Sequence, residues 1–293
     1  MNTVAIGCTV PIYNSAPPFH PHCSYPESRF QDRSQSPNLP YHLFRRLLLD
    51  LGLDSTRYGT AEWNPFGHMV SPGQTVLIKP NFVLDRNLSG GDLFASITHP
   101  SLLRAIVDYL YIALSGDGKI IIADAPQIDC DWVALMKAQR LDAVQDFYHA
   151  RFGFDIEVHD LRSIVLRNHH LPAYDSNKRG QPGDLLGEQL VDLGARSAFR
   201  EFASTKNFYG ADYNRGELAS FHSGGRHCYA ISRTVLTSDL IVSVPKLKVH
   251  KKVGVTLNLK GLVGITTQKN CLIHYRLGTP KDGGDQLPDG GRW

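Results

Sequence analysis

The sequence predicts an α/β protein with a mostly parallel sheet flanked by helices, and with an irregular insertion. Three apolar runs, Thr75–Lys79, Lys119–Ala123 and Leu240–Val244, are rich in β-branched residues, as fully buried strands are. A proline follows each run within three residues and cannot donate to a strand ladder. The amphipathic stretch Leu102–Leu114 lies between the first two runs. Strand–helix–strand order with a helix of this length is typical of a parallel sheet.

Periodicity and turn residues predict the remaining elements. Leucines at helical spacing indicate a helix over Tyr41–Leu51, which Gly52 ends. Pro100 suits the first turn of the Leu102–Leu114 helix, and Thr98 or His99 is expected to cap it. The other expected elements are a first strand at Thr3–Val10, helical turns in two pieces over Trp132–Phe152, a strand nearer the sheet edge at Phe154–Leu161, a short strand at His227–Ile231 and a short helix ending at Ser238.

The regular pattern is interrupted in the second half of the chain. The stretch 162–226 is rich in Gly, Asp, Asn and Tyr and holds only short strand-like runs such as Gln189–Leu193. We therefore expect residues 1–161 to form the first part of an α/β core and 162–226 an insertion or small lobe. Residues 227–293 are expected to form the second part of the core, which carries a basic motif.

Composition excludes several classes of protein. The chain has 293 residues, 42% of them hydrophobic, and a net charge of +3, which is too balanced for a nucleic-acid binder. Five scattered cysteines (Cys8, Cys23, Cys130, Cys228 and Cys271) form no CxxC pair, so no disulfide framework or iron–sulfur cluster is expected. The sequence shows neither a signal peptide nor a membrane span, so we expect a cytoplasmic protein without membrane contact. No pattern indicates the oligomeric state.

Polar side chains follow three of the predicted strands, where each strand ends. They are Lys79 and Asn81 after the first strand, Asp124 after the second, and Lys246, Lys248 and His250 after the third. Ligands of open parallel sheets bind in the crevice at the carboxyl ends of the strands. If the three strands are neighbours, these residues converge on one crevice, and their charge predicts a small anionic ligand, a carboxylate or a phosphate.

The basic stretch after Val244 is the strongest of these signals. Lys246 and Lys248 are two residues apart, so on an extended chain they point the same way, and His250 continues that face. Paired ammonium groups lower each other's pKa and suit the binding of an anion or a lysine that acts as a base.

The segment that follows the basic stretch carries three more polar candidates. A helix that begins near Gly254 would place Thr256 and Lys260 on one face, with Asn258 to the side. Its N-terminal amides would also point at an anion.

We assign catalytic roles to His250, Asp124 and Lys248. Among cations Asp124 would stay ionised, as a general base or a metal ligand requires. The expected substrate-binding residues are Lys79, Asn81, His99, Lys246, Thr256, Asn258 and Lys260. His99 has an equally good interpretation as the cap of the helix that follows it. No cofactor is indicated, and a divalent metal at the crevice is left open.

Two functions fit these residues. The first is an enzyme that acts on a small anionic substrate, and the second is a non-catalytic protein that binds a phosphorylated cofactor or a saccharide. The chain contains no GxxxxGK[ST], GxGxxG, HExxH or GxSxG motif. Assignment by motif to an ATPase, a dehydrogenase, a zincin or a serine hydrolase therefore has no support.

Several blocks of the sequence resemble the domain of unknown function 362 family. They are IKPNF, THP, ADAP, SRTVLTSDLIVSVPKLKVH, TLNLKGLVG and NCLIHYRLGTPKDGGDQ, between Val76 and Asp285, with residues 162–226 the least similar part. The resemblance implies a fold rather than an activity. Some members carry ferredoxin-type cysteine clusters, which this chain lacks, so electron transfer is the least favoured function. Members usually continue past the GGD block, so the chain is expected to be a fragment or a truncated gene product that lacks C-terminal site residues.

Overall fold

The computed structural model describes residues 3–202, 207–210, 215–250 and 254–285. The protein chain forms two compact units, unit 1 and unit 2. Unit 1 comprises residues 1–124, 131–159 and 238–262, and unit 2 comprises residues 125–130, 160–237 and 263–293. The domain limits derived from the sequence stay a prediction.

A four-stranded sheet is the centre of unit 1. Its strands are β1 (Thr75–Pro80), β2 (Lys119–Asp124), β3 (Ile156–Asp160) and β9 (Leu240–Val244), in the order β3-β2-β1-β9. Strand β1 pairs in parallel with both β2 and β9. The α/β prediction is therefore confirmed, and β3 lies at a sheet edge, as expected.

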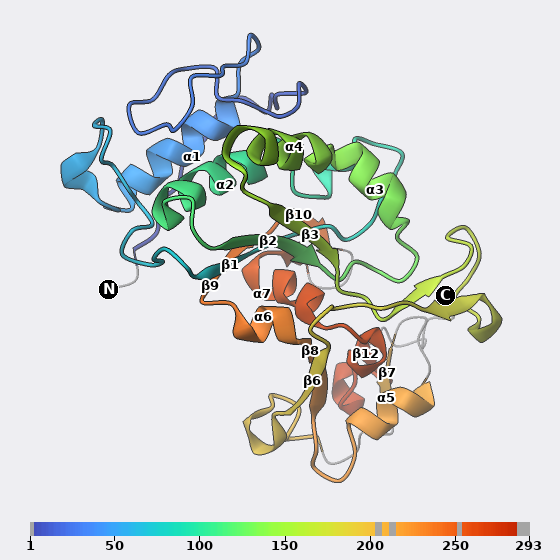
Figure 1. Cartoon of the computed structure of the whole chain (residues 1–293). Helices are drawn as coiled ribbons and strands as arrows, with labels where there is room; N and C mark the ends of the chain where they lie inside the picture. The colour runs from blue at the N-terminus through green and yellow to red at the C-terminus, as the bar shows by residue number, and fades with distance from the viewer. Residues whose placement is uncertain (1–2, 203–206, 211–214, 251–253, 286–293) are drawn as a thin grey trace. The chain divides into compact units, whose positions relative to one another are not determined.

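Helices pack against this sheet and form the hydrophobic core with it. Figure 1 shows α1 (Leu39–Asp50), α2 (Pro100–Leu114) and α4 (Leu141–Phe152) on one side of the sheet, with α3 (Trp132–Gln139) next to α4. Helix α2 packs against α1, β1 and β2. Its buried leucines and the Val-Leu-Ile centre of β1 exclude water completely. The predicted helices at these positions are confirmed, including the two pieces over 132–152.

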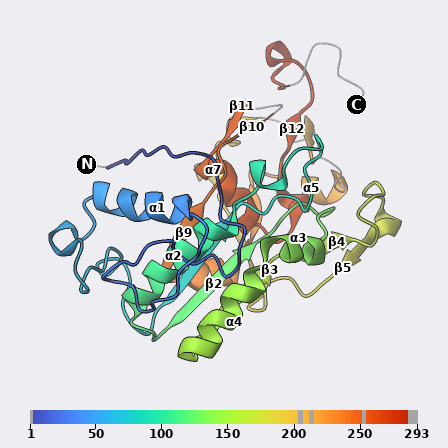
Figure 2. The same cartoon turned by 90° about the horizontal axis from the view of Figure 1, so that it is seen from above.

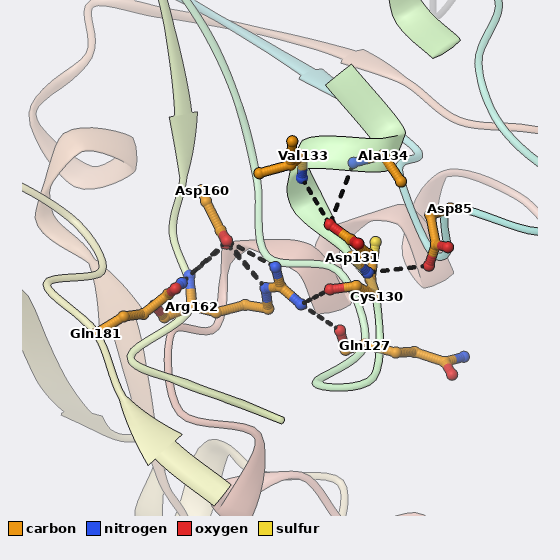
Figure 3. A network of polar contacts seen from close by, with 9 residues as sticks. All are labelled: Asp85, Gln127, Cys130, Asp131, Val133, Ala134, Asp160, Arg162 and Gln181. Atoms are coloured by element: carbon orange, nitrogen blue, oxygen red, sulfur yellow. Dashed lines mark hydrogen bonds and ion pairs between the residues drawn. The ribbon is translucent and has the colours of Figure 1, made fainter. Parts of the chain in front are cut away.

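Capping side chains fix where these helices begin. Pro100 is the first residue of α2, and the His99 side chain accepts a hydrogen bond from the backbone N–H of Ser101. Asn38 caps α1 in the same way, so that helix begins two residues earlier than Tyr41. Asp131 caps α3 through the N–H groups of residues 133 and 134, as Figure 3 shows. Each cap satisfies a donor that the helix itself cannot.

Three local predictions are wrong. Thr3–Val10 forms no strand, and its side chains are mostly exposed, because no neighbouring strand pairs with this run. Strand β9 is not fully buried, since it is an edge strand and Ile241 is 42% exposed. Gly254 does not begin a helix.

The chain after β9 turns back on itself as a hairpin instead. Strand β10 (Lys248–His250) pairs antiparallel with β11 (Gly254–Thr256), and helix α7 (Asn258–Gly261) begins only after the hairpin. Figure 2 shows the hairpin extending past α7. Thr256 and Lys260 therefore do not share a helical face.

Unit 2 consists of short elements. Its antiparallel pairs are β4 (Ile164–Leu166) with β5 (Lys178–Gly180), β6 (Glu188–Asp192) with β8 (Cys228–Ser232), and β7 (Phe208–Tyr209) with β12 (Tyr275–Arg276); its helices are α5 (Arg215–Phe221) and α6 (Arg233–Thr237). The strand expected at His227–Ile231 and the short helix after it are confirmed as β8 and α6.

A buried arginine holds the start of unit 2 together. The Arg162 guanidinium pairs with the Asp160 carboxylate at 2.7 Å. It also donates to the carbonyl oxygens of Gln127 and Cys130, at 2.7 and 2.9 Å (Figure 3). These bonds satisfy a charge that would otherwise be costly to bury.

None of the helices in the described part of the chain is long and apolar enough to cross a bilayer.

Candidate anion-binding site

The carboxyl ends of β2, β1 and β9 meet at one edge of the sheet, as the sequence predicted. Lys79 and Asp124, at the ends of β1 and β2, are buried, and their charged atoms lie 2.7 Å apart. The Lys79 ammonium also donates to the Pro80 carbonyl, and the second Asp124 oxygen accepts from the backbone N–H of Phe82. Both carboxylate oxygens are thus bonded within the protein. The pair holds the ends of the two strands together.

A loop after β1 connects this pair to the basic stretch. The Asn81 side chain donates to the Ser96 carbonyl at 2.9 Å, and the Lys248 ammonium donates to the same oxygen at 3.0 Å. The Thr98 hydroxyl accepts from the Asn81 backbone N–H and donates to the Val244 carbonyl. Asn81 therefore positions the loop to which Lys248 is bonded.

His99 lies beneath this loop as a neutral ring. Its Nδ1 accepts from the Ser101 N–H, so the proton of the neutral ring is on Nε2. Tyr13 stacks on the ring, with centroids 4.2 Å apart. Burial, and secondly the charge of Lys246, lower the pKa of His99 from 6.5 to about 4. The capping interpretation of His99 is confirmed, and its role in binding stays a prediction.

Three lysines form the charged part of the site. Burial lowers the pKa of Lys248, and the nearby charges of Lys260 and Lys246 lower it further. The Lys246 ammonium lies 3.3 Å from the Tyr13 hydroxyl. Within the described residues, Lys246 and Lys248 bond only to the Tyr13 hydroxyl and the Ser96 carbonyl, so neither has a carboxylate partner. Like charges thus gather at a half-buried position, where charge is disfavoured. We call Lys246, Lys248 and Lys260 the lysine cluster.

The hairpin fixes the spacing of this cluster. The buried Thr256 hydroxyl lies 3.3 Å from the carbonyl oxygens of both Lys246 and Lys248. Asn258 is exposed at the start of α7, and its side-chain oxygen accepts from the Ser243 hydroxyl of β9. His250 is half-buried on β10, opposite Gly254. Thr256 and Asn258 therefore tie the hairpin and α7 to the sheet.

The sequence did not indicate Tyr13 or the Ser96 carbonyl. Tyr13 lies in a Pro- and Ser-rich stretch without periodicity, and a backbone oxygen has no residue-type signal. Among the residues that the structure describes, no three His, Cys, Asp or Glu side chains lie close enough together to hold a metal ion.

Fold and site together define an α/β protein with a lysine-rich site at the carboxyl ends of its parallel strands. The model of the domain of unknown function 362 family matches residues 187–285, so this segment is similar to that family. The match includes the lysine cluster. The blocks IKPNF, THP and ADAP lie before it. No curated protein and no solved structure matches the chain significantly.

Proposed function

We propose that unit 1 binds a small anion, a carboxylate or a phosphate, at the lysine cluster. The grouping of Lys248 with Lys246 and Lys260 is the observation that carries this proposal. Burial first, and then the charges of Lys260 and Lys246, lower the pKa of Lys248, and no carboxylate on Lys246 or Lys248 offsets those charges. A bound anion would lie within reach of at least two ammonium groups and would relieve their repulsion. The neutral His99 beneath Tyr13 would keep the floor of the site uncharged.

We further propose that the protein is an enzyme that acts on this anion. Of the three catalytic candidates, Lys248 is best supported, because a lowered pKa increases its neutral fraction and lets it accept a proton. His250, two residues along β10, is the second candidate for moving a proton. The five free cysteines favour a reducing compartment, and we propose the cytoplasm.

One observation favours the alternative, a non-catalytic protein that binds a phosphorylated cofactor or a saccharide. Asp124, the carboxylate expected to act as base or metal ligand, has both oxygens bonded to Lys79 and Phe82. The site therefore has more groups that bind an anion than groups that transfer a proton. Native mass spectrometry of the purified chain, followed by incubation with the anion it carries, separates the two functions by whether a product forms.

Replacement of Lys248 by methionine is expected to weaken anion binding by roughly ten- to a hundredfold, because one charge-assisted hydrogen bond contributes about 1.5–3 kcal/mol. Calorimetric titration with inorganic phosphate and with acetate measures this. For the unaltered protein, affinity should also fall at alkaline pH sooner than an ordinary lysine would cause, because Lys248 loses its proton earlier.

The matched control is Lys137→Met, which removes an exposed lysine of α3 outside the cluster and should leave affinity unchanged. Equal affinity of folded Lys248→Met and Lys137→Met variants would rule out the lysine cluster as the binding site. His250→Ala tests the catalytic part separately, since it should slow turnover of a bound anion while phosphate binding persists.

A further inference from the structure

The β10–β11 hairpin has two chemically different faces. Val249 and Val255 lie opposite each other in the ladder, and both are exposed. Side chains alternate between the two faces of a strand, so Leu247 and Leu257, both exposed, extend the same face toward the base of the hairpin. Lys248 and Thr256, the next pair in register, belong to the other face and are bonded within the protein. We call Leu247, Val249, Val255 and Leu257 the apolar face.

This arrangement reverses the usual one, in which a ribbon turns its apolar side chains inward. The four side chains are between 47% and 89% exposed, whereas Thr256 behind them is 4% exposed. An isolated two-stranded hairpin is marginally stable in water and needs something packed on its apolar side chains. Exposed apolar groups that are contiguous, rather than scattered singly, mark interaction surfaces.

We propose that the apolar face is the contact through which two copies of this chain associate. Each of its side chains leaves roughly 100 Å² of apolar surface in water, so the face covers roughly 400 Å². A stable interface buries about 800 Å² on each partner, of which somewhat more than half is apolar. The face therefore supplies most of the apolar area that one half of a dimer interface requires.

A second copy is also the occupant that the distribution of charge favours. The four residues of the apolar face are uncharged, so a two-fold axis can place the face on itself as an apolar contact. Val249 and Val255, which lie opposite each other in the ladder, then meet the same pair of the second copy. An anionic membrane would need lysines on the side of the apolar residues. Of the lysines that the structure describes here, Lys246 and Lys248 are bonded to Tyr13 and Ser96 behind the hairpin.

Sedimentation velocity of the full chain over a range of concentrations tests this proposal, and it does not depend on anion binding. The unaltered protein should sediment as a dimer. Val249→Glu and, separately, Val255→Glu should each convert it to a monomer, because every dimer would then bury two carboxylates. Both sites are exposed, so far-ultraviolet circular dichroism should show an unchanged fold.

Val133→Glu is the matched control, since Val133 is an exposed valine in the first turn of α3, where an acidic residue is tolerated. That variant should remain a dimer. A monomeric unaltered protein overturns the proposal, whether or not it binds anionic phospholipid vesicles or another protein. A dimer that persists in both Val249→Glu and Val255→Glu also overturns it.

Discussion

Replacement of Lys79 by methionine is expected to lower the free energy of unfolding by about 3–5 kcal/mol, because it leaves the Asp124 carboxylate buried without its counter-charge. Both residues are almost fully buried, so water cannot replace the lost ammonium. The Phe82 N–H still donates to Asp124, but one hydrogen bond does not offset the burial of a full negative charge. Denaturation in urea measures the difference.

The double variant Lys79→Met/Asp124→Asn should recover much of this loss. It buries no charge, and the asparagine oxygen can still accept from the Phe82 N–H. Lys119→Met, at the exposed start of β2, is the matched control and should change stability by less than about 0.5 kcal/mol. If Lys79→Met is no more damaging than Lys119→Met, the pair does not hold the strand ends together.

The double variant also addresses the role of Asp124. If Lys79 and Asp124 have only a structural role, the double variant should keep both the affinity of the lysine cluster for phosphate and the turnover of the bound anion. A catalytic Asp124 predicts instead that the folded double variant binds phosphate normally and forms no product. Stability, binding and turnover therefore report on three different roles of one pair of residues.

Much of the sheet could be predicted from the sequence, since three apolar β-branched runs ended by proline allow few other structures. Their parallel order followed from the helix of crossover length between the first two. Whether a lysine at the end of such a strand faces a crevice or a neighbouring strand could not be predicted. Lys79 pairs with Asp124 because β1 and β2 are adjacent in register, and that is a property of the assembled sheet.

The segment after the basic stretch shows where residue spacing alone does not predict the secondary structure. Residues 254–260 allow two interpretations. Val255, Leu257 and Leu259 alternate with other residues as in a strand, whereas Thr256 and Lys260 are four residues apart as on one face of a helix. The structure forms a strand over Gly254–Thr256 and a helix only from Asn258 on. Gly254 has a φ of 79°, a left-handed conformation that does not begin a helix. Pairing with β10 decides the outcome, and short segments give no local signal of such a partner.

Acidification from pH 6.5 to pH 4 is expected to destabilise the protein by about 3 kcal/mol through His99 alone. The folded-state pKa of His99 is about 4, mainly because the ring is buried and secondly because Lys246 is near, while Asp92 opposes this shift. Between about pH 6.5 and 4 the unfolded chain therefore binds a proton that the folded chain does not. The contribution of the neutral His99 ring to the free energy of unfolding is fully present above pH 6.5 and is lost as the pH decreases through this window.

His99→Asn isolates this contribution. Asparagine is a good helix cap and can accept from the Ser101 N–H as His99 does, so the cap is kept. Loss of the buried ring stacked on Tyr13 lowers stability at pH 7 by an amount that does not depend on pH. Asparagine does not titrate, so the loss of stability between pH 7 and pH 4 should be smaller than in the unaltered protein by about 3 kcal/mol. Urea denaturation at a series of pH values measures how steeply the free energy of unfolding falls with pH in each protein.

The matched control is His68→Asn, which removes an exposed histidine of unit 1. Its free energy of unfolding should fall with pH as steeply as that of the unaltered protein. His20 retains its own lowered pKa, also about 4, in every variant, so the His99 contribution appears only as a difference. If His99→Asn and the unaltered protein lose equal stability on acidification, the His99 ring is protonated without cost. The site beneath Tyr13 would then be open to water, and a neutral floor for the lysine cluster would have to be abandoned.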